Sequence, residues 1–290
     1  MDKKNIPDWL KIRIPFDTDE TSHSPVKRSL KENNLNTVCE SASCPNLNSC
    51  WSSGTATFLI LGNICSRNCR FCDIKSGKPL PPDPAEPEKI LAAVRELQLK
   101  HVVLTSVSRD DLPDGGSAHF ATAIECLKSS LSGISVEALI PDFKGSADSL
   151  RNIFSAQPDI INHNLETVQS LYTTICPQSS YPRSLQLLQR CAEAGFVTKS
   201  GLLLGMGESM PEVKTTISDL RQNGVQMLTI GQYLKPGPKK ANISSFIEPA
   251  QFERLRQHAL SMGFVHVQSA PLVRSSYHAS LAHLALKGHL

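Results

Sequence analysis

The chain has 290 residues, 40% hydrophobic and 20% charged, which is the composition of an ordinary globular protein. Its 30 Lys and Arg residues nearly balance 27 Asp and Glu, so a net charge of +3 gives no strong field for nucleic acid. No apolar run approaches the ~20 residues of a membrane span, and the first twenty residues lack an apolar signal core. We therefore expect a cytoplasmic protein that binds neither membranes nor nucleic acid.

From about Thr55 onward, short apolar or β-branched runs alternate with amphipathic stretches. This alternation predicts parallel strands joined by crossover helices. The predicted strands are TATFLILG, HVVLTSV, SVEALIPDF, DIINHNL, VTKSGLLLG, QMLTIGQYL and FVHVQSAPLV. The predicted helices span residues 87–99, 117–129, 146–154, 184–194, 211–222 and 249–262. Six or seven such units predict an α/β barrel, complete or partial.

Nine cysteines are the most informative residues of the chain. Their odd number, without a recognisable export signal, argues against a disulfide framework and favours metal or redox chemistry. Cys65, Cys69 and Cys72, which we call the downstream triad, follow the first predicted strand with the spacing C-x3-C-x2-C. A metal centre held by three protein ligands keeps one coordination position open. At the carboxyl end of a parallel strand, an open position indicates catalysis.

A second group, Cys39, Cys44 and Cys50, has the spacing C-x4-C-x5-C, and we call it the upstream triad. Zinc is the alternative to an iron–sulfur cluster, because soft sulfur ligands suit both. However, a structural zinc site takes four ligands, commonly in C-x2-C pairs, and no second pair follows the downstream triad. The remaining cysteines are predicted to be packing or loop residues: Cys126, Cys176 and Cys191.

The downstream triad, with Phe71 directly before its last cysteine, resembles the signature of the radical S-adenosylmethionine (SAM) enzymes. Longer blocks resemble one family of these enzymes, the lipoyl synthases: VCESASCPNLNSCW, VLTSVSRDDLPDGGSAHF, NHNLETV, TKSGLLLGMGE, LTIGQYL and PLVRSSYHA. The resemblance covers nearly the whole chain. It implies a partial (βα)6-type TIM barrel over residues 55–268, an amino-terminal extension (1–54) carrying the upstream triad, and a carboxyl-terminal segment (269–290) carrying RSSYHA.

The resemblance also implies roles for the site residues. The downstream triad is expected to hold a [4Fe-4S] cluster whose fourth iron binds SAM, with Phe71, Asn164 and Glu166 in the SAM site. The loop SRDDLPDGG, residues 108–116, is expected near SAM; without the resemblance it would be a solvated connection that starts a helix. The upstream triad is expected to hold a second [4Fe-4S] cluster that Ser275 completes. Otherwise, Ser275 and Ser276 would form a hydroxyl-rich turn.

The implied reaction inserts two sulfur atoms at the sixth and eighth carbons of an octanoyl chain on a lysine of a lipoyl carrier domain. Cleavage of SAM gives a 5′-deoxyadenosyl radical, which removes hydrogen from carbons that no general base can deprotonate. The second cluster supplies the sulfur. The implied partners are 2-oxoacid dehydrogenase E2 subunits and the glycine cleavage H protein as carriers, flavodoxin or ferredoxin as electron donor, and an iron–sulfur carrier for cluster repair.

Three positions depart from the family pattern: Asn63 stands where aspartate is common, Cys176 where arginine is usual, and the loop 239–246 lacks a usual histidine. None of these three departures lies in a cysteine triad; they bear on contacts with the carrier domain rather than on the reaction class. The basic segment Lys235–Lys240 is predicted to dock acidic carriers, although a solvated basic loop is an equal alternative.

Two other functions compete with this interpretation. A methylthiotransferase acting on RNA or protein would usually carry a further RNA-binding domain and a larger amino-terminal domain. A zinc-stabilised interaction protein would contain zinc without acid-labile sulfide, so metal analysis separates it from a cluster enzyme.

Overall fold

The computed structural model describes residues 6–11, 25–42, 44–47, 50, 57–277 and 279. Contacts divide the chain into two compact units, which we describe separately. The described residues of 25–68 and 74–162 form the amino-terminal unit, and those of 6–11, 69–73 and 163–277 form the carboxyl-terminal unit. The boundaries predicted at residues 54 and 268 stay predictions. In the described ranges, no helix is long and apolar enough to cross a membrane.

Strands in the amino-terminal unit pair in chain order: β1 (Asn36–Thr37), β2 (Thr57–Ile60), β5 (His101–Ser106), β6 (Ser135–Leu139) and β7 (Ile160–Asn162). Only the pairing of β1 with β2 is antiparallel. Register is fixed by partners such as Thr57 with Val103, and Val103 with Glu137. Every residue of β2 and β7 is buried, as is typical of parallel strands covered on both faces.

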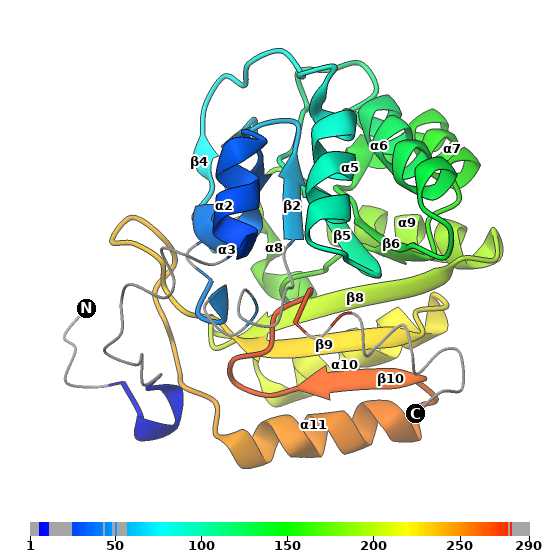
Figure 1. Cartoon of the computed structure of the whole chain (residues 1–290). Helices are drawn as coiled ribbons and strands as arrows, with labels where there is room; N and C mark the ends of the chain where they lie inside the picture. The colour runs from blue at the N-terminus through cyan, green and yellow to red at the C-terminus, as the bar shows by residue number, and fades with distance from the viewer. Residues whose placement is uncertain are drawn as a thin grey trace. The chain divides into compact units, whose positions relative to one another are not determined.

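Helices connect these strands: α5 (Glu86–Glu96), α6 (Ser117–Ser130) and α7 (Ala147–Ser155). They pack in succession, α5 on α6 and α6 on α7 (Figure 1). Proline in the first turn starts α5, and the Ser146 hydroxyl accepts a hydrogen bond from Ser149 N at the start of α7. The shorter helices of this unit are α2 (Pro25–Glu32), α3 (Val38–Ser41) and the 3-10 turn η3 (Phe143–Gly145).

Three parallel strands form the sheet of the carboxyl-terminal unit: β8 (Val197–Leu204), β9 (Met227–Gln232) and β10 (His266–Ser269). Met227 of β9 pairs with Lys199 on one side and with His266 on the other. The helices are α8 (Tyr172–Ile175), α9 (Tyr181–Glu193), α10 (Met210–Gln222) and α11 (Pro249–Ser261), with 3-10 turns η2 (Asp8–Leu10) and η4 (Gln169–Leu171). Helix α11 packs along β10 (Figure 1).

All strands and helices predicted from the alternation are present, with ends that differ from the prediction by a few residues. The α/β class with parallel strands is therefore confirmed. Helix α5 begins at Glu86, one residue before the predicted start. A proline at the second helical position fits that start, since the first turn needs no N–H donor there.

Two strand glycines let other segments approach the sheet of the carboxyl-terminal unit. A Cβ on Gly201 of β8 would lie 2.7 Å from Asn164 Oδ1 and 2.8 Å from Thr229 Oγ1. A Cβ on Gly231 of β9 would lie 2.1 Å from the Val273 carbonyl oxygen. All three distances are too short for a real side chain, so these glycines make room for the segments that line the site.

Candidate active site

The downstream triad begins at a sharp turn after β2. Leu61 has a left-handed φ of 67°, its N–H donates to Glu86 Oε2 at 2.9 Å, and its carbonyl accepts from Arg109 Nη1 at 3.3 Å. The chain then pairs β3 (Ile64–Cys65) with β4 (Lys75–Ser76) in parallel. Cys65 therefore lies in the loop at the carboxyl end of the first long parallel strand, as predicted.

The Cys65 sulfur accepts two backbone hydrogen bonds. The donors are Arg67 N at 3.4 Å and Ser108 N at 3.3 Å. Ser66 ties the same two loops together, since its N–H donates to Ser108 O at 3.0 Å and its hydroxyl accepts from Asp110 N at 2.9 Å. Hydrogen bonds to sulfur are a main control on iron–sulfur sites, so this environment fits a metal-bound thiolate. The loop SRDDLPDGG thus contacts the first cysteine of the downstream triad.

The buried guanidinium of Arg67 pairs with two aspartates of the neighbouring loops. It donates to both carboxylate oxygens of Asp110, at 2.8 and 2.9 Å, and to Asp142 Oδ1 at 2.6 Å. The side chains of Arg67 and Asp142 are only 4% and 1% exposed. Bidentate pairing and burial make this a strong charge-assisted contact. It connects the cysteine loop to the loops that follow β5 and β6.

Cys69 and Cys72 belong to the carboxyl-terminal unit, where Cys72 N donates to the Cys69 carbonyl at 3.4 Å. Backbone hydrogen bonds of 2.8 Å join Arg70 N to Ile175 O and Ala241 N to Arg70 O. Lys240 Nζ also donates to the Cys69 carbonyl, at 3.4 Å. Two further segments of this unit thus hold the second half of the cysteine loop. Phe71, predicted in the SAM site, is half-buried between these cysteines.

The upstream triad folds into successive tight turns of the amino-terminal unit. The Thr37 hydroxyl accepts from Cys39 N at 3.1 Å at the start of α3, and Cys44 N donates to the Cys39 carbonyl at 3.0 Å. Burial, together with smaller effects of the negative charges of Cys39 and Cys44, raises the pKa of Cys50 to about 11. The three thiols therefore lie within electrostatic reach of one another.

The three thiols of the upstream triad are soft donors, which suit iron–sulfur cores and zinc alike. Among the residues that the structure describes, no three His, Cys, Asp or Glu side chains converge to hold one metal ion. The thiolates of a [4Fe-4S] core bind separate irons, so they need to be near one another without meeting at a point. Three neighbouring soft donors are the set that such a core takes.

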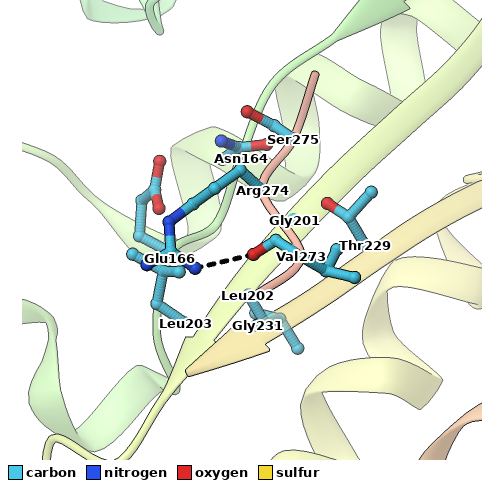
Figure 2. A pocket seen from close by; sticks show the side chains of 10 residues that line it. All are labelled: Asn164, Glu166, Gly201, Leu202, Leu203, Thr229, Gly231, Val273, Arg274 and Ser275. Atoms are coloured by element: carbon cyan, nitrogen blue, oxygen red, sulfur yellow. Dashed lines mark hydrogen bonds between the residues drawn. The ribbon is translucent and has the colours of Figure 1, made fainter. Parts of the chain in front are cut away.

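A pocket of the carboxyl-terminal unit brings together three residues that were singled out separately in the sequence: Asn164, Glu166 and Ser275 (Figure 2). The backbone of Glu166 has a left-handed φ of 67°. It is held against β8 because Glu166 N donates to Gly201 O at 3.0 Å and its carbonyl accepts from Leu203 N at 2.8 Å. A non-glycine residue in this conformation is uncommon and frequently marks a functional site.

The pocket combines a carboxyl group with a guanidinium. Burial raises the pKa of Glu166 to about 7, although a hydrogen bond with Asn164 and the charge of Arg274 lower it. Arg274 Nη1 donates to the Val273 carbonyl at 2.7 Å (Figure 2). A carboxyl group that exchanges its proton near neutrality, next to a cation and a hydroxyl, can bind the ammonium and carboxylate groups of an amino-acid ligand.

The sequence analysis missed several of these contacts. It did not single out Arg67, Arg274 or Thr229. Arg274 and Thr229 lie inside the quoted blocks PLVRSSYHA and LTIGQYL, and Arg67 lies between Cys65 and Cys69 of the downstream triad. The upstream triad and Ser275 belong to different units, so their shared ligation of a cluster stays a prediction.

Comparison with known proteins assigns the class. Residues 59–220, more than half of the chain, match the Radical SAM superfamily. The fold is similar to that of methylornithine synthase, with a TM-score of 0.52 and 14% identity over 73% of this chain and 70% of that one. It is also similar to coproporphyrinogen III oxidase from Escherichia coli, with a TM-score of 0.53 and 12% identity over 77% and 57%. The chain is a radical SAM enzyme.

More similar relatives define the family. The lipoyl synthase of Leptospira biflexa is 51% identical over 94% of this chain and 90% of its own length. That of Pelodictyon phaeoclathratiforme is 50% identical over 94% and 92%. The chain belongs to the lipoyl synthase family, whose members are enzymes that transfer sulfur. Membership in the radical SAM superfamily implies a [4Fe-4S] cluster and SAM as cofactors.

The Arg67 contact gives a testable prediction. Replacing Arg67 with Ala leaves the Asp142 carboxylate buried without its cation, which should lower the free energy of unfolding by about 3 to 5 kcal/mol. It should also lower iron incorporation, because Cys65 and its donors lie in the loops that Arg67 joins. Chemical denaturation and iron analysis measure the two effects. As a control, Arg254→Ala removes an exposed contact to Gln251 and should change stability by less than about 0.5 kcal/mol. Equal stability of the two variants would contradict the prediction.

Proposed function

We propose that this chain inserts two sulfur atoms into protein-bound octanoyl-lysine with two [4Fe-4S] clusters, one for each cysteine triad. The observation that carries the proposal is the identity of about 50% to lipoyl synthases over 94% of the chain, which includes both triads. The hydrogen-bonded sulfur of Cys65 and the neighbouring thiols of the upstream triad support it.

The downstream triad is the proposed site of SAM cleavage. The bound cluster and SAM would supply a carbon radical strong enough to break an unactivated C–H bond. The residues of this chain bind and orient: Asn164 and Glu166 offer hydrogen bonds to the polar end of SAM, and Arg274 provides a cation for its carboxylate. The half-buried ring of Phe71 provides an apolar surface beside the cysteines.

The upstream triad is the proposed sulfur source. Cys39, Cys44 and Cys50 provide thiolates for three irons, and the hydroxyl of Ser275 is the proposed fourth ligand. An alkoxide oxygen is a harder ligand than a thiolate and a poorer match to an iron–sulfur core. It would therefore mark the iron that is released when sulfur is given up.

Lipoyl carrier proteins are the substrates that the family implies, together with a reductant. E2 subunits and the glycine cleavage H protein are the proposed carriers, flavodoxin or ferredoxin the proposed donor, and an iron–sulfur carrier the proposed means of repair. The direct test is anaerobic incubation with SAM, a reductant and an octanoylated lipoyl-domain peptide, followed by mass spectrometry. A gain of two sulfur atoms supports the proposal. Zinc without acid-labile sulfide, and no sulfur insertion, would overturn it.

The two triads should separate functionally. Replacing the three cysteines of the downstream triad with Ala should abolish SAM cleavage, because no iron remains open to SAM. The same change in the upstream triad should spare cleavage but abolish sulfur insertion. Release of 5′-deoxyadenosine and mass of the peptide product report the two steps. Cys126→Ala, at a half-buried thiol of α6 outside both triads, is the matched control and should retain both activities. Continued 5′-deoxyadenosine release without the downstream triad would refute the assignment.

Ser275 should matter more than its neighbour Ser276. Ser275→Cys should keep the second cluster yet hinder sulfur transfer, since a thiolate holds iron more tightly than an alkoxide. Ser275→Ala should weaken the site, whereas Ser276→Ala should have a smaller effect. Lipoyl product per enzyme, measured beside iron content, distinguishes these outcomes. A normal single-turnover yield from Ser275→Ala would remove Ser275 from the ligand set.

The basic segment Lys235–Lys240 divides into inner and outer residues. Lys240 contacts the Cys69 carbonyl, and Lys235 donates to Asn242 Oδ1 at 2.7 Å, whereas Lys239 is exposed. Lys239 is therefore the residue that tests docking of an acidic carrier without disturbing the downstream triad.

Lys239→Glu should weaken carrier binding roughly twofold to fivefold at low salt, and less at high salt, because an exposed charge contact is screened. SAM cleavage should be unchanged. Carrier affinity at two ionic strengths is the measurement. Lys214→Glu, an exposed charge reversal on α10, serves as the control for net charge. Equal affinities of both variants and the wild type at low salt would rule out docking at this segment.

A further inference from the structure

Glu86 is a buried carboxylate whose hydrogen bonds lead away from its own helix. It is the first residue of α5, and it is 6% exposed. An acidic side chain at such a position commonly serves the free N–H groups of its own helix. Here Asp83 serves the start of the helix, since its carboxylate accepts from Ala85 N at 2.9 Å and its carbonyl accepts from Glu86 N at 3.0 Å. The Glu86 carboxylate is therefore available to another segment.

One oxygen of Glu86 takes part in two hydrogen bonds. Leu61 N donates to Oε2 at 2.9 Å, and His119 Nε2 of α6 contacts the same atom at 2.7 Å. With an ionised carboxylate, the ring nitrogen is the donor, because a carboxylate oxygen only accepts. His119 thus orients the carboxylate toward Leu61.

Leu61 is also held on its other sides. Its carbonyl accepts from Arg109 Nη1, and the same guanidinium pairs with the Asp111 carboxylate. A Cβ on Gly116 would lie 2.4 Å from Leu61 Cδ1, so this glycine makes room for the leucine side chain. A leucine with a φ of 67° is sterically disfavoured and persists only where its surroundings over-determine it. The acceptor of its N–H is part of those surroundings.

The turn at Leu61 affects where the Cys65 sulfur lies. Only three residues separate Leu61 from Cys65, so a changed backbone angle at the turn moves the sulfur relative to its donors, Arg67 N and Ser108 N. Ser108 directly precedes Arg109, which binds the Leu61 carbonyl. One loop therefore contacts both ends of this short segment.

We propose that Glu86 is a positioning residue of the downstream triad: its carboxylate, oriented by His119, holds the turn at Leu61 and so keeps the Cys65 sulfur against its backbone donors. The inference rests on the proposed ligand role of Cys65. Hydrogen bonds to a ligating sulfur are among the contacts that tune and hold a cluster, so loosening them should make the cluster more labile. Glu86 acts through the turn and contacts neither metal nor substrate.

The test is the stability of the cluster in the full-length, anaerobically reconstituted enzyme, measured as the loss of the EPR signal that SAM alters after a chelator is added. Glu86→Ala removes the acceptor of Leu61 N and should speed this loss about tenfold, as changes to outer-shell partners do. Glu86→Gln keeps an oxygen with two lone pairs, which can accept both bonds, and should restore a rate close to that of the wild type. Glu96→Ala is the matched control, because Glu96 is the last residue of α5 and its carboxylate accepts from the Ser29 hydroxyl of α2. It should leave the rate unchanged.

The thermal midpoint of each variant separates a labile cluster from a loss of fold. If Glu86→Ala does not fold, His119→Ala takes its place, because it keeps the acceptor and removes only the group that orients it; the loss should then speed up by a smaller factor. An unchanged rate in the variant tested overturns the inference, as does a Glu86→Gln rate equal to that of Glu86→Ala. A rate that follows the thermal midpoint across all variants, Glu96→Ala included, also overturns it. A wild type without iron and acid-labile sulfide contradicts the proposed function instead.

Discussion

The buried charge of Arg67 is the interaction on which the loops around Cys65 depend. A guanidinium that is 4% exposed cannot remain unpaired, because an uncompensated buried ion costs several kcal/mol. Asp110 and Asp142 supply its counter-charges from the ends of two successive parallel strands. One cation therefore joins three loops at the edge where parallel α/β folds carry their chemistry. The backbone donors of the Cys65 sulfur are held in place as a consequence.

The regular part of the fold could be predicted from the sequence because its signals are local. Strands such as β2 and β9 are buried along their whole length, so each contains a cluster of apolar residues. Proline or capping residues begin several helices. Helices α3 and α8 are among those that were not predicted. Each has only four residues, which is about one turn, and a single turn shows no hydrophobic period.

The site could be predicted only where its residues are close in sequence. The cysteine spacings are such a signal, and the structure bears out the expected placement of Cys65 after β2. The pocket of Glu166 and Arg274 is different, because more than a hundred residues separate its walls. Gly201 leaves room for the side chain of Asn164. However, a glycine in a strand sequence does not indicate which segment packs against it.

The surroundings of the thiols differ between the two triads. The Cys65 sulfur accepts two backbone hydrogen bonds. In contrast, burial and the charges of Cys39 and Cys44 raise the pKa of Cys50. The Cys50 thiolate is therefore stabilised by a positively charged core, since burial and neighbouring charges raise the pKa of Cys50 and metal binding must release its proton. Under the proposed function this core is consumed. The Cys50 thiol would then take up a proton again, because burial disfavours its thiolate form, whereas the two backbone donors at the Cys65 sulfur would favour a thiolate that keeps its metal.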